Sequence, residues 1–137
     1  MSSTPNLSPI NVVAYAPGVC NIGPEEIARR RRSGHISLIA SAILLAVLLA
    51  IGAPAWSRLI LAVTAAGAAS GYLQAWLHFC AGFGSMGVYN FGPLGTVERV
   101  PDSSARTRDR VRSIQIGLAS LAIGLAVGIG AVLLPVR

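Results

Sequence analysis

Three long stretches of this sequence contain no Asp, Glu, Lys or Arg, and they constrain the fold more than any other feature. They cover residues 35–53, 59–79 and 114–134, which are 19, 21 and 21 residues long. At about 1.5 Å per residue, a helix of that length reaches roughly 28–32 Å, the thickness of the hydrocarbon core of a bilayer. The stretches show neither the polar stripe of a soluble helix nor the alternation of a transmembrane strand. We therefore predict an all-α integral membrane protein with three transmembrane helices.

The charged residues lie almost entirely on one side of these spans. All five acids and nine of the eleven arginines come before the first span or between the second and third, and only Arg58 and Arg137 do not. Because basic residues gather on the cytoplasmic side, we expect the protein in the cytoplasmic (inner) membrane, with its N-terminus in the cytoplasm and its C-terminus outside.

Arginines next to a membrane span are explained by topology and by attraction to anionic lipid headgroups. We therefore predict anionic lipids as partners and no nucleic acid. The arginines expected to meet lipid are Arg29, Arg30, Arg31, Arg32, Arg106, Arg108, Arg110 and Arg112.

The segment before the first span divides into two parts. Residues 1–23 carry three prolines and no charge, which predicts an extended, ordered cytoplasmic arm docked on its own bundle or on another subunit. The contacts of the arm are expected from Val12, Val13, Tyr15 and Val19. Pro24 followed by Glu25 and Glu26 is a helix-start signal. We predict a short interfacial helix over residues 24–33 and a bend at Gly34.

The remaining boundaries follow from the same patterns. We predict transmembrane helices over residues 35–53, 58–80 and 113–135, joined on the cytoplasmic side by a loop over residues 81–112. The loop is first rich in glycine and aromatic residues and then rich in arginine, with a helix restarting at Pro101-Asp102-Ser103-Ser104. Ala53-Pro54-Ala55 imitates a signal-peptide cleavage site. The 34 residues before the apolar stretch would be longer than the usual N-terminal region of a signal peptide, so we expect the first span to be retained.

Small residues four apart mark the second and third spans. They are Gly67 and Gly71 in the second span, and Ser120, Gly124 and Gly128 in the third. This spacing puts small residues on one helix face and lets helix backbones approach closely. We favour packing of the second and third spans against each other; the alternative is a contact face for another subunit.

Polar residues inside the second span follow the same helix face. Ser70, Gln74 and His78 are the members of this group, and Gln74 is the most deeply placed. A polar residue inside a membrane faces protein or a cavity. We favour a hydrogen bond from Gln74 to a neighbouring helix; the alternative is a ligand, proton or quinone site.

The two histidines and two cysteines invite a comparison with metal and haem sites. Cys20, His35, His78 and Cys80 all belong to the predicted cytoplasmic side. No C-x-x-C spacing occurs, and residues 78 and 80 point in different directions on a helix. We therefore predict no metal and no cofactor, and no Cys20–Cys80 disulfide in a reducing cytoplasm.

Glycines at positions 82, 84 and 87 match G-x-G-x-x-G. A dinucleotide site needs that pattern between a strand and a helix. We expect these glycines to serve a turn or close packing.

No catalytic arrangement is found, so the chain is not predicted to be an enzyme. The leading hypothesis is a non-catalytic small accessory or structural subunit of a larger membrane complex, respiratory, photosynthetic or transport, with other membrane subunits as partners. Its docking surfaces would be the N-terminal arm and the loop over residues 81–95. The alternatives are a homo-oligomeric small channel or transporter lined by Ser70 and Gln74, and a redox or metal-binding membrane protein using Cys20, His35, His78 and Cys80.

Overall fold

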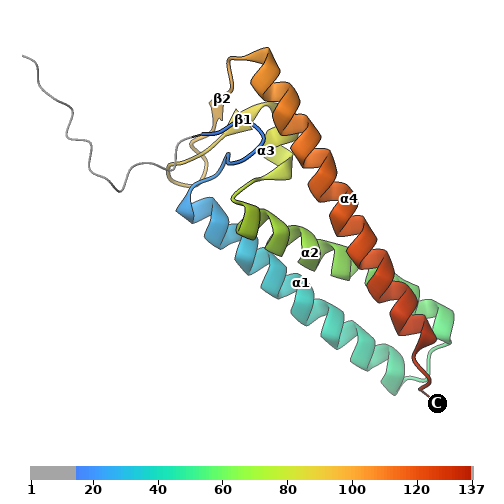
Figure 1. The fold of residues 1–137 in the computed structure, drawn as a ribbon. Coiled ribbons are helices and arrows are strands. Elements are labelled where there is room, and N and C mark those ends of the chain that lie inside the picture. The colour runs from blue at the N-terminus through green and yellow to red at the C-terminus, as the bar shows by residue number, and fades with distance from the viewer. Residues whose placement is uncertain (1–14, 137) are drawn as a thin grey trace, which may run out of the picture.

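The computed structural model describes residues 15–136, which form three long helices with a small folded region at one end (Figure 1). The long helices are α1 (Pro24–Ala50), α2 (Leu61–Leu77), which follows the short 3₁₀ helix η1 (Ala55–Ile60), and α4 (Ser103–Leu133). Helix α1, the segment Ala55–Leu77 and α4 are each long and apolar enough to cross a membrane. The prediction of a mostly helical protein with three such helices is confirmed. The part of the predicted arm that includes Val12 and Val13 lies outside the described residues.

The first long helix has no break where one was predicted. Helix α1 runs without interruption from Pro24, at its first position, to Ala50. The prediction of a separate helix over residues 24–33 with a bend at Gly34 is therefore wrong. Gly34 is buried because the Tyr72 ring of α2 lies against it, so its small size serves helix packing. The four arginines before this position, Arg29 to Arg32, are good helix formers and favour a helix that continues up to it.

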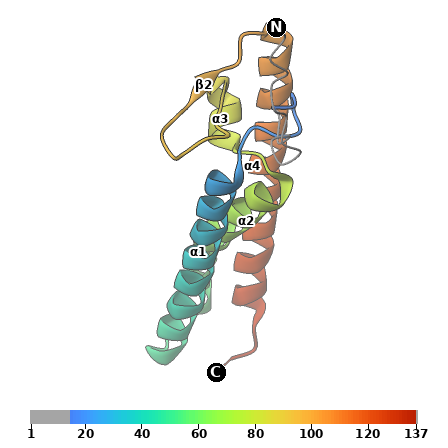
Figure 2. The same cartoon turned by 90° about the vertical axis from the view of Figure 1, so that its left-hand side faces the viewer.

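Helix α2 is the middle helix of an open layer. It packs extensively against both α1 and α4, whereas α1 and α4 hardly contact each other, and they stand apart in Figure 2. Its predicted glycines face α1: a Cβ added at Gly71 would lie 2.6 Å from the Gly34 nitrogen, and one at Gly67 would lie 3.2 Å from Ser37 Oγ.

The glycines of α4 pack on the other side of α2. A Cβ added at Gly124 would overlap the carbonyl oxygen of Ala62 and lie 2.7 Å from Ala66 Cβ, and one at Gly128 would lie 2.9 Å from Ala62 Cβ. Ser120 is also buried on this face and bonds its hydroxyl to the Ile116 carbonyl at 2.8 Å. The two glycine pairs therefore meet different helices of the same chain and do not meet each other.

The stretch predicted as a loop over residues 81–112 is largely folded. It contains α3 (Ala81–Met86), strands β1 (Val88–Tyr89) and β2 (Glu98–Arg99), which pair antiparallel, and the first turns of α4. Gly84 is buried against Phe79 and Ser113, and Gly87 ends α3 with a left-handed conformation, so these glycines do serve packing and a turn. Asp102 caps α4 by accepting bonds from Ser104, and these bonds lower the pKa of the Asp102 carboxyl.

The close approach of α2 and α4 predicts opposite effects for two glycines on the same helix. Gly124→Ala should lower the free energy of unfolding by about 1–3 kcal/mol, because the new methyl group overlaps the α2 backbone. Gly130→Ala should leave stability unchanged or raise it by up to about 1 kcal/mol, because a Cβ there meets nothing within 4 Å and alanine favours a helix. Unfolding of both variants in mixed micelles, followed by circular dichroism, measures the difference. Equal effects would contradict this packing.

Candidate functional site

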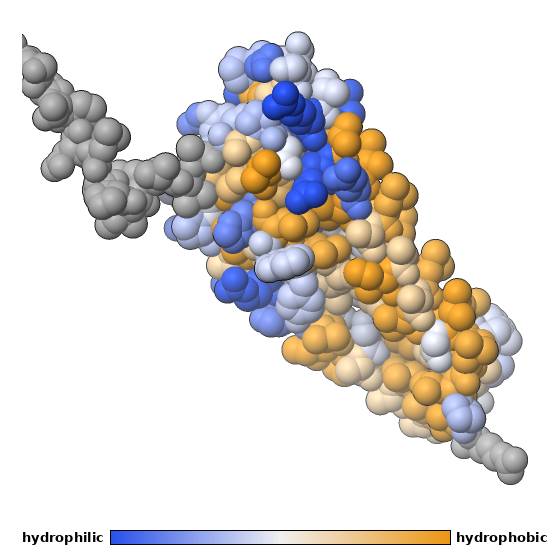
Figure 3. All heavy atoms as spheres, in the orientation of Figure 1, coloured by the Kyte–Doolittle hydropathy of each residue, from blue (hydrophilic) through white to orange (hydrophobic). Residues whose placement is uncertain are grey.

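The polar residues gather at one end of the molecule, which we call the head: residues 15–30, which include the start of α1, residues 78–102 and the first turns of α4 up to Ser113. Figure 3 shows hydrophilic side chains over this end and apolar ones along the long helices. Several of its polar residues are almost fully buried, namely Asn21, Glu26, Asn90, Asp109 and Ser113. Because buried polar groups need hydrogen-bond partners, the head holds most of the specific polar contacts of the described chain.

The side chain of Asn21 joins the start of α1 to the end of α2. Its amide nitrogen donates to the Cys80 carbonyl at 3.0 Å, and its amide oxygen accepts from the Cys80 nitrogen at 2.6 Å. Its backbone nitrogen donates to the His78 carbonyl at 3.2 Å. One fully buried residue therefore satisfies the backbone that follows α2.

Asn90 connects this point to the strand region. Its backbone nitrogen donates to the Asn21 carbonyl at 3.0 Å, and its carbonyl accepts from the Gly23 nitrogen at 2.8 Å. Its side-chain oxygen accepts from the Gly92 nitrogen at 2.9 Å, and its side-chain nitrogen donates to the Pro93 carbonyl at 3.0 Å. Asn90 therefore shapes the turn between β1 and β2 and attaches it to the N-terminal segment.

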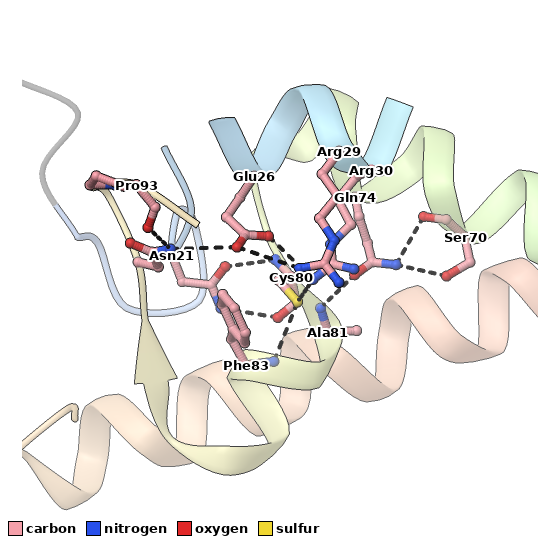
Figure 4. A network of polar contacts seen from close by, with 11 residues as sticks. Asn21, Glu26, Arg29, Arg30, Ser70, Gln74, Cys80, Ala81, Phe83 and Pro93 are labelled. Atoms are coloured by element: carbon pink, nitrogen blue, oxygen red, sulfur yellow. Dashed lines mark hydrogen bonds and ion pairs between the residues drawn. The ribbon is translucent and has the colours of Figure 1, made fainter. Parts of the chain in front are cut away.

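Glu26, Arg30 and Cys80 form the charged part of the same network (Figure 4). Glu26 is 1% exposed and lies 3.6 Å from the Arg30 guanidinium, which also donates to Cys80 Sγ at 2.9 Å. The guanidinium lies 5.8 Å from the centre of the Phe83 ring. Arg30 thus compensates the buried charge of Glu26 and joins α1 to α3.

Asp109 attaches the N-terminal segment to α4. This fully buried carboxylate accepts from the Tyr15 hydroxyl at 2.6 Å and from the Gly18 nitrogen at 2.8 Å. Burial, together with the bond to Asp109, raises the pKa of Tyr15 well above its ordinary value. The Tyr15 ring also stacks on Tyr89 with 5.0 Å between ring centres. Tyr15 therefore makes the contact expected of it, whereas Val19 is 62% exposed and does not.

Gln74 bonds within α2 and to the first residue of the short helix α3, and it makes no bond to either of the other long helices, α1 and α4. Its amide nitrogen donates to Ser70 Oγ at 2.8 Å and to the Ser70 carbonyl at 3.1 Å. Its oxygen accepts from the Ala81 nitrogen at 2.9 Å. Gln74 therefore stabilises the end of its own helix and the start of α3, because the chain turns back sharply there.

His78 lies beyond α2 and does not continue the Gln74 face. It takes a left-handed conformation with φ of 55°, is exposed, and ends the helix at Leu77 rather than at the predicted position 80. His35 lies on α1 and shares a hydrogen bond of 2.6 Å with the Tyr72 hydroxyl. Within residues 15–136, no three His, Cys, Asp or Glu side chains are grouped as metal ligands would be.

The cysteines offer little nucleophilic chemistry. Cys20 and Cys80 are unpaired. Burial raises the pKa of the Cys20 thiol, which favours its unreactive neutral form. Cys80 is 2% exposed, and its sulfur accepts from Arg30 and from the Phe83 nitrogen. Both side chains therefore act in packing and bonding within the head.

The eight arginines predicted to meet lipid divide into two groups. Arg30 is bonded within the network described above, and Arg106 donates to the carbonyls of Val100 and Pro101 at 2.8 and 3.2 Å. The side chain of Arg29 is 58% exposed and lies 3.9 Å from Glu26. The others are exposed or half-buried and lie in no ion pair with a described residue: Arg31, Arg32, Arg108, Arg110 and Arg112.

Arg58 has a structural role at the opposite end of the molecule. It is 5% exposed, and its Nη1 donates at 3.2 Å to the carbonyls of both Ala131 and Leu134. These carbonyls belong to the end of α4, where the helix dipole is negative and backbone acceptors lack partners. Arg58 therefore caps the last span.

Sequence reasoning missed the residues that build the head, namely Asn21, Asn90 and Asp109. Only Asp109 had a usable signal. Asp109 lies on the same face of α4 as Gly124, because residues on this face recur every three or four positions. The others between them on this face, and the one before, are also buried: Ser120, Ile116, Ser113 and Ala105. An acid that falls on a stripe of small and polar residues is expected to point inward and to need partners.

Comparison with known proteins found no match for the chain among protein-family models, curated proteins or solved structures.

The contacts of Asn21 predict that its truncation is costly. Asn21→Ala leaves the buried nitrogen and carbonyl of Cys80 without their partners, and each such loss costs about 1–3 kcal/mol. We expect the free energy of unfolding in mixed micelles to fall by about 2–4 kcal/mol. Ser85→Ala, which removes an exposed bond to the Ala81 carbonyl, should change it by less than about 0.5 kcal/mol. Similar values for the two variants would contradict the role of Asn21.

The raised pKa of Tyr15 predicts a loss of stability in alkaline solution. The folded state favours the neutral phenol of Tyr15. The contribution of Tyr15 to the free energy of unfolding is therefore complete below the ordinary tyrosine pKa of 10.0, and it is lost as the pH rises toward the raised pKa. Tyr15→Phe should be less stable at neutral pH and should show a smaller further loss above pH 10 than the unchanged protein. Unfolding measured across this range tests it.

Tyr89→Phe is the matched control, because the Tyr89 phenol bonds to the exposed Glu98, and this bond also raises its pKa. The assignment is overturned if Tyr89→Phe removes more of the alkaline loss than Tyr15→Phe does.

Proposed function

We propose that this chain is a non-catalytic small subunit of a larger membrane complex, whose head faces the cytoplasm and docks on other membrane subunits. The observation that carries the proposal is the combination of a rigidly bonded head with exposed apolar side chains outside the long helices. Leu94 is 51% exposed and Val97 is 46% exposed, and both lie in the turn between β1 and β2. Exposed apolar groups on a fixed surface are typical of interaction sites.

The internal bonding of the head supports a structural role. Two hydrogen bonds fix the turn that carries Leu94. The Leu94 nitrogen donates to Glu25 Oε2 of α1 at 3.1 Å, and within the turn Thr96 Oγ1 donates to the Pro93 carbonyl at 2.7 Å. A turn held in this way presents its side chains in one arrangement, which lowers the entropy cost of binding a partner. The buried side chains of Asn21, Asn90 and Asp109 are bonded within the head, which suits a structural role better than a site for chemistry.

The arrangement of the long helices also supports an accessory role over a transport path within one chain. Because α1 and α4 pack on opposite sides of α2, the described helices form an open layer. Gln74 and Ser70, which would line a path between protomers, are bonded to each other. Of the most apolar part of α1, a stretch long enough to cross a membrane, only 6% is buried in the structure. Most of this stretch is therefore available to lipid or to neighbouring subunits.

The proposal predicts that a charge in the β1–β2 turn releases the chain from its complex. Leu94→Asp should abolish stoichiometric recovery of other membrane subunits with the tagged chain after gentle detergent extraction, because a charge buried in an interface is costly. Ser103→Asp adds the same charge at another exposed position of the head and should leave recovery unchanged. Circular dichroism of both variants checks that the helices remain. The proposal is wrong if the unchanged chain is recovered alone, or if Leu94→Asp retains every subunit.

A further inference from the structure

We propose that the head end of α4 binds one anionic phospholipid, with its phosphate at Arg108 and Arg112 and one acyl chain between α2 and α4. The inference rests on the membrane location of the long helices and does not depend on the docking role proposed above. It goes beyond general attraction of arginines to a charged surface, because it assigns the lipid to two of the arginines and to one groove.

The polar part of this site is a hollow beside the N-terminal segment. The hollow has a volume of about 290 Å³, and its walls include Pro17, Thr107, Arg108, Arg112 and Gln115. Arg108, Arg112 and Gln115 recur every three or four residues, so they share one face of α4. A phosphate in this hollow would meet two guanidinium groups one helical turn apart.

The two arginines have donors to spare. Arg112 makes one long bond of 3.4 Å, from Nη1 to Gln115 Oε1, and its Nε is buried with no partner among the described residues. Arg108 makes neither an ion pair nor a side-chain hydrogen bond with a described residue. The nearest acid in the sequence, Asp109, is buried and turned toward Tyr15 and Gly18. Two unneutralised guanidinium groups favour an anion with several acceptor oxygens, such as a phosphate diester.

The apolar part of the site continues from the same side chains. A second hollow of about 190 Å³ shares Arg112 and Gln115 with the first and is otherwise lined by Leu73, Leu77, Ile116 and Ala119. Position 112 is the last charged one before the charge-free stretch of α4, which begins at residue 114. The charged hollow therefore lies at the boundary of the apolar region, and the second hollow leads into it.

The dimensions suit one leaflet of a bilayer. From Arg108 to Ala119 the helix advances eleven residues, or roughly 17 Å. Half of a hydrocarbon core of about 30 Å is about 15 Å. A ligand with a phosphate at Arg108 and Arg112 and an apolar chain that reaches Ala119 is a phospholipid, and a free phosphate would leave the second hollow unused.

The purified full chain in neutral detergent provides the test, with thermal unfolding titrated by phosphatidylglycerol, by phosphatidylcholine and by inorganic phosphate. We expect saturable stabilisation by phosphatidylglycerol alone. Replacing both arginines (Arg108→Gln with Arg112→Gln) should weaken this binding about thirtyfold, at about 1 kcal/mol per arginine and 1.4 kcal/mol per factor of ten. Equal stabilisation by inorganic phosphate, or by phosphatidylcholine, would overturn the assignment.

Two matched controls separate a specific site from diffuse attraction. Arg110→Gln removes the same charge from an arginine that does not line the hollow, and should change the affinity less than threefold. Ala119→Phe should fill the apolar hollow and weaken binding at least tenfold, whereas Leu118→Phe, at a 63% exposed neighbour outside it, should not. If Arg110→Gln equals Arg112→Gln, or if the two phenylalanine variants bind alike, no such site exists.

Discussion

The hydrogen bonds between the Asn21 side chain and the Cys80 backbone are the contact on which the rest of the head depends. Helix α2 ends at Leu77, and the chain then reverses through the left-handed His78 into a buried position. A buried backbone amide must find a partner in the protein because no water reaches it. Asn21 supplies both bonds, and in doing so it fixes the segment before α1, to which Asn90 then attaches the strand region. The head is therefore assembled outward from one amide group rather than from a large apolar core.

The long helices pack closely at small residues, and these residues contact other helices of the same chain. Between helices in lipid there is little hydrophobic driving force, so association relies on van der Waals contact and on small residues. Gly71 permits the contact with α1, and Gly124 the contact with α4. The outward surfaces of α1 and α4 carry large exposed apolar side chains such as Ile43 and Leu118, which either lipid or protein could cover. Any specific recognition of a partner is therefore expected from the head.

The sequence predicts the three spans because their length and lack of charge depend only on the thickness and polarity of a bilayer. It predicts the start of α4 as well, because Asp102 and Ser104 form a local cap. The uninterrupted passage of α1 through Gly34 was not predicted, because a glycine suits either a bend or close packing, and the Tyr72 ring that packs on it belongs to another helix. The roles of Asn21 and Gln74 have the same character: an amide can bond to its own helix, to a neighbour or to a turn, and only the folded arrangement selects among them. The head was missed because bonds between residues about sixty positions apart leave no periodic signal.

The arginines of this chain have several different structural roles, whereas a prediction of orientation from charge counts treats them all alike. Arg30 compensates a buried acid, Arg106 bonds to backbone carbonyls before α4, and Arg112 has donors to spare. Arg58, the exception to the charge asymmetry within the described chain, caps the last turn of α4, where a helix presents unbonded carbonyls and partial negative charge. A guanidinium bound in this way is explained by the helix end it satisfies, whichever side of the membrane it occupies. Arg58 is therefore no counterexample to the orientation proposed from the remaining arginines.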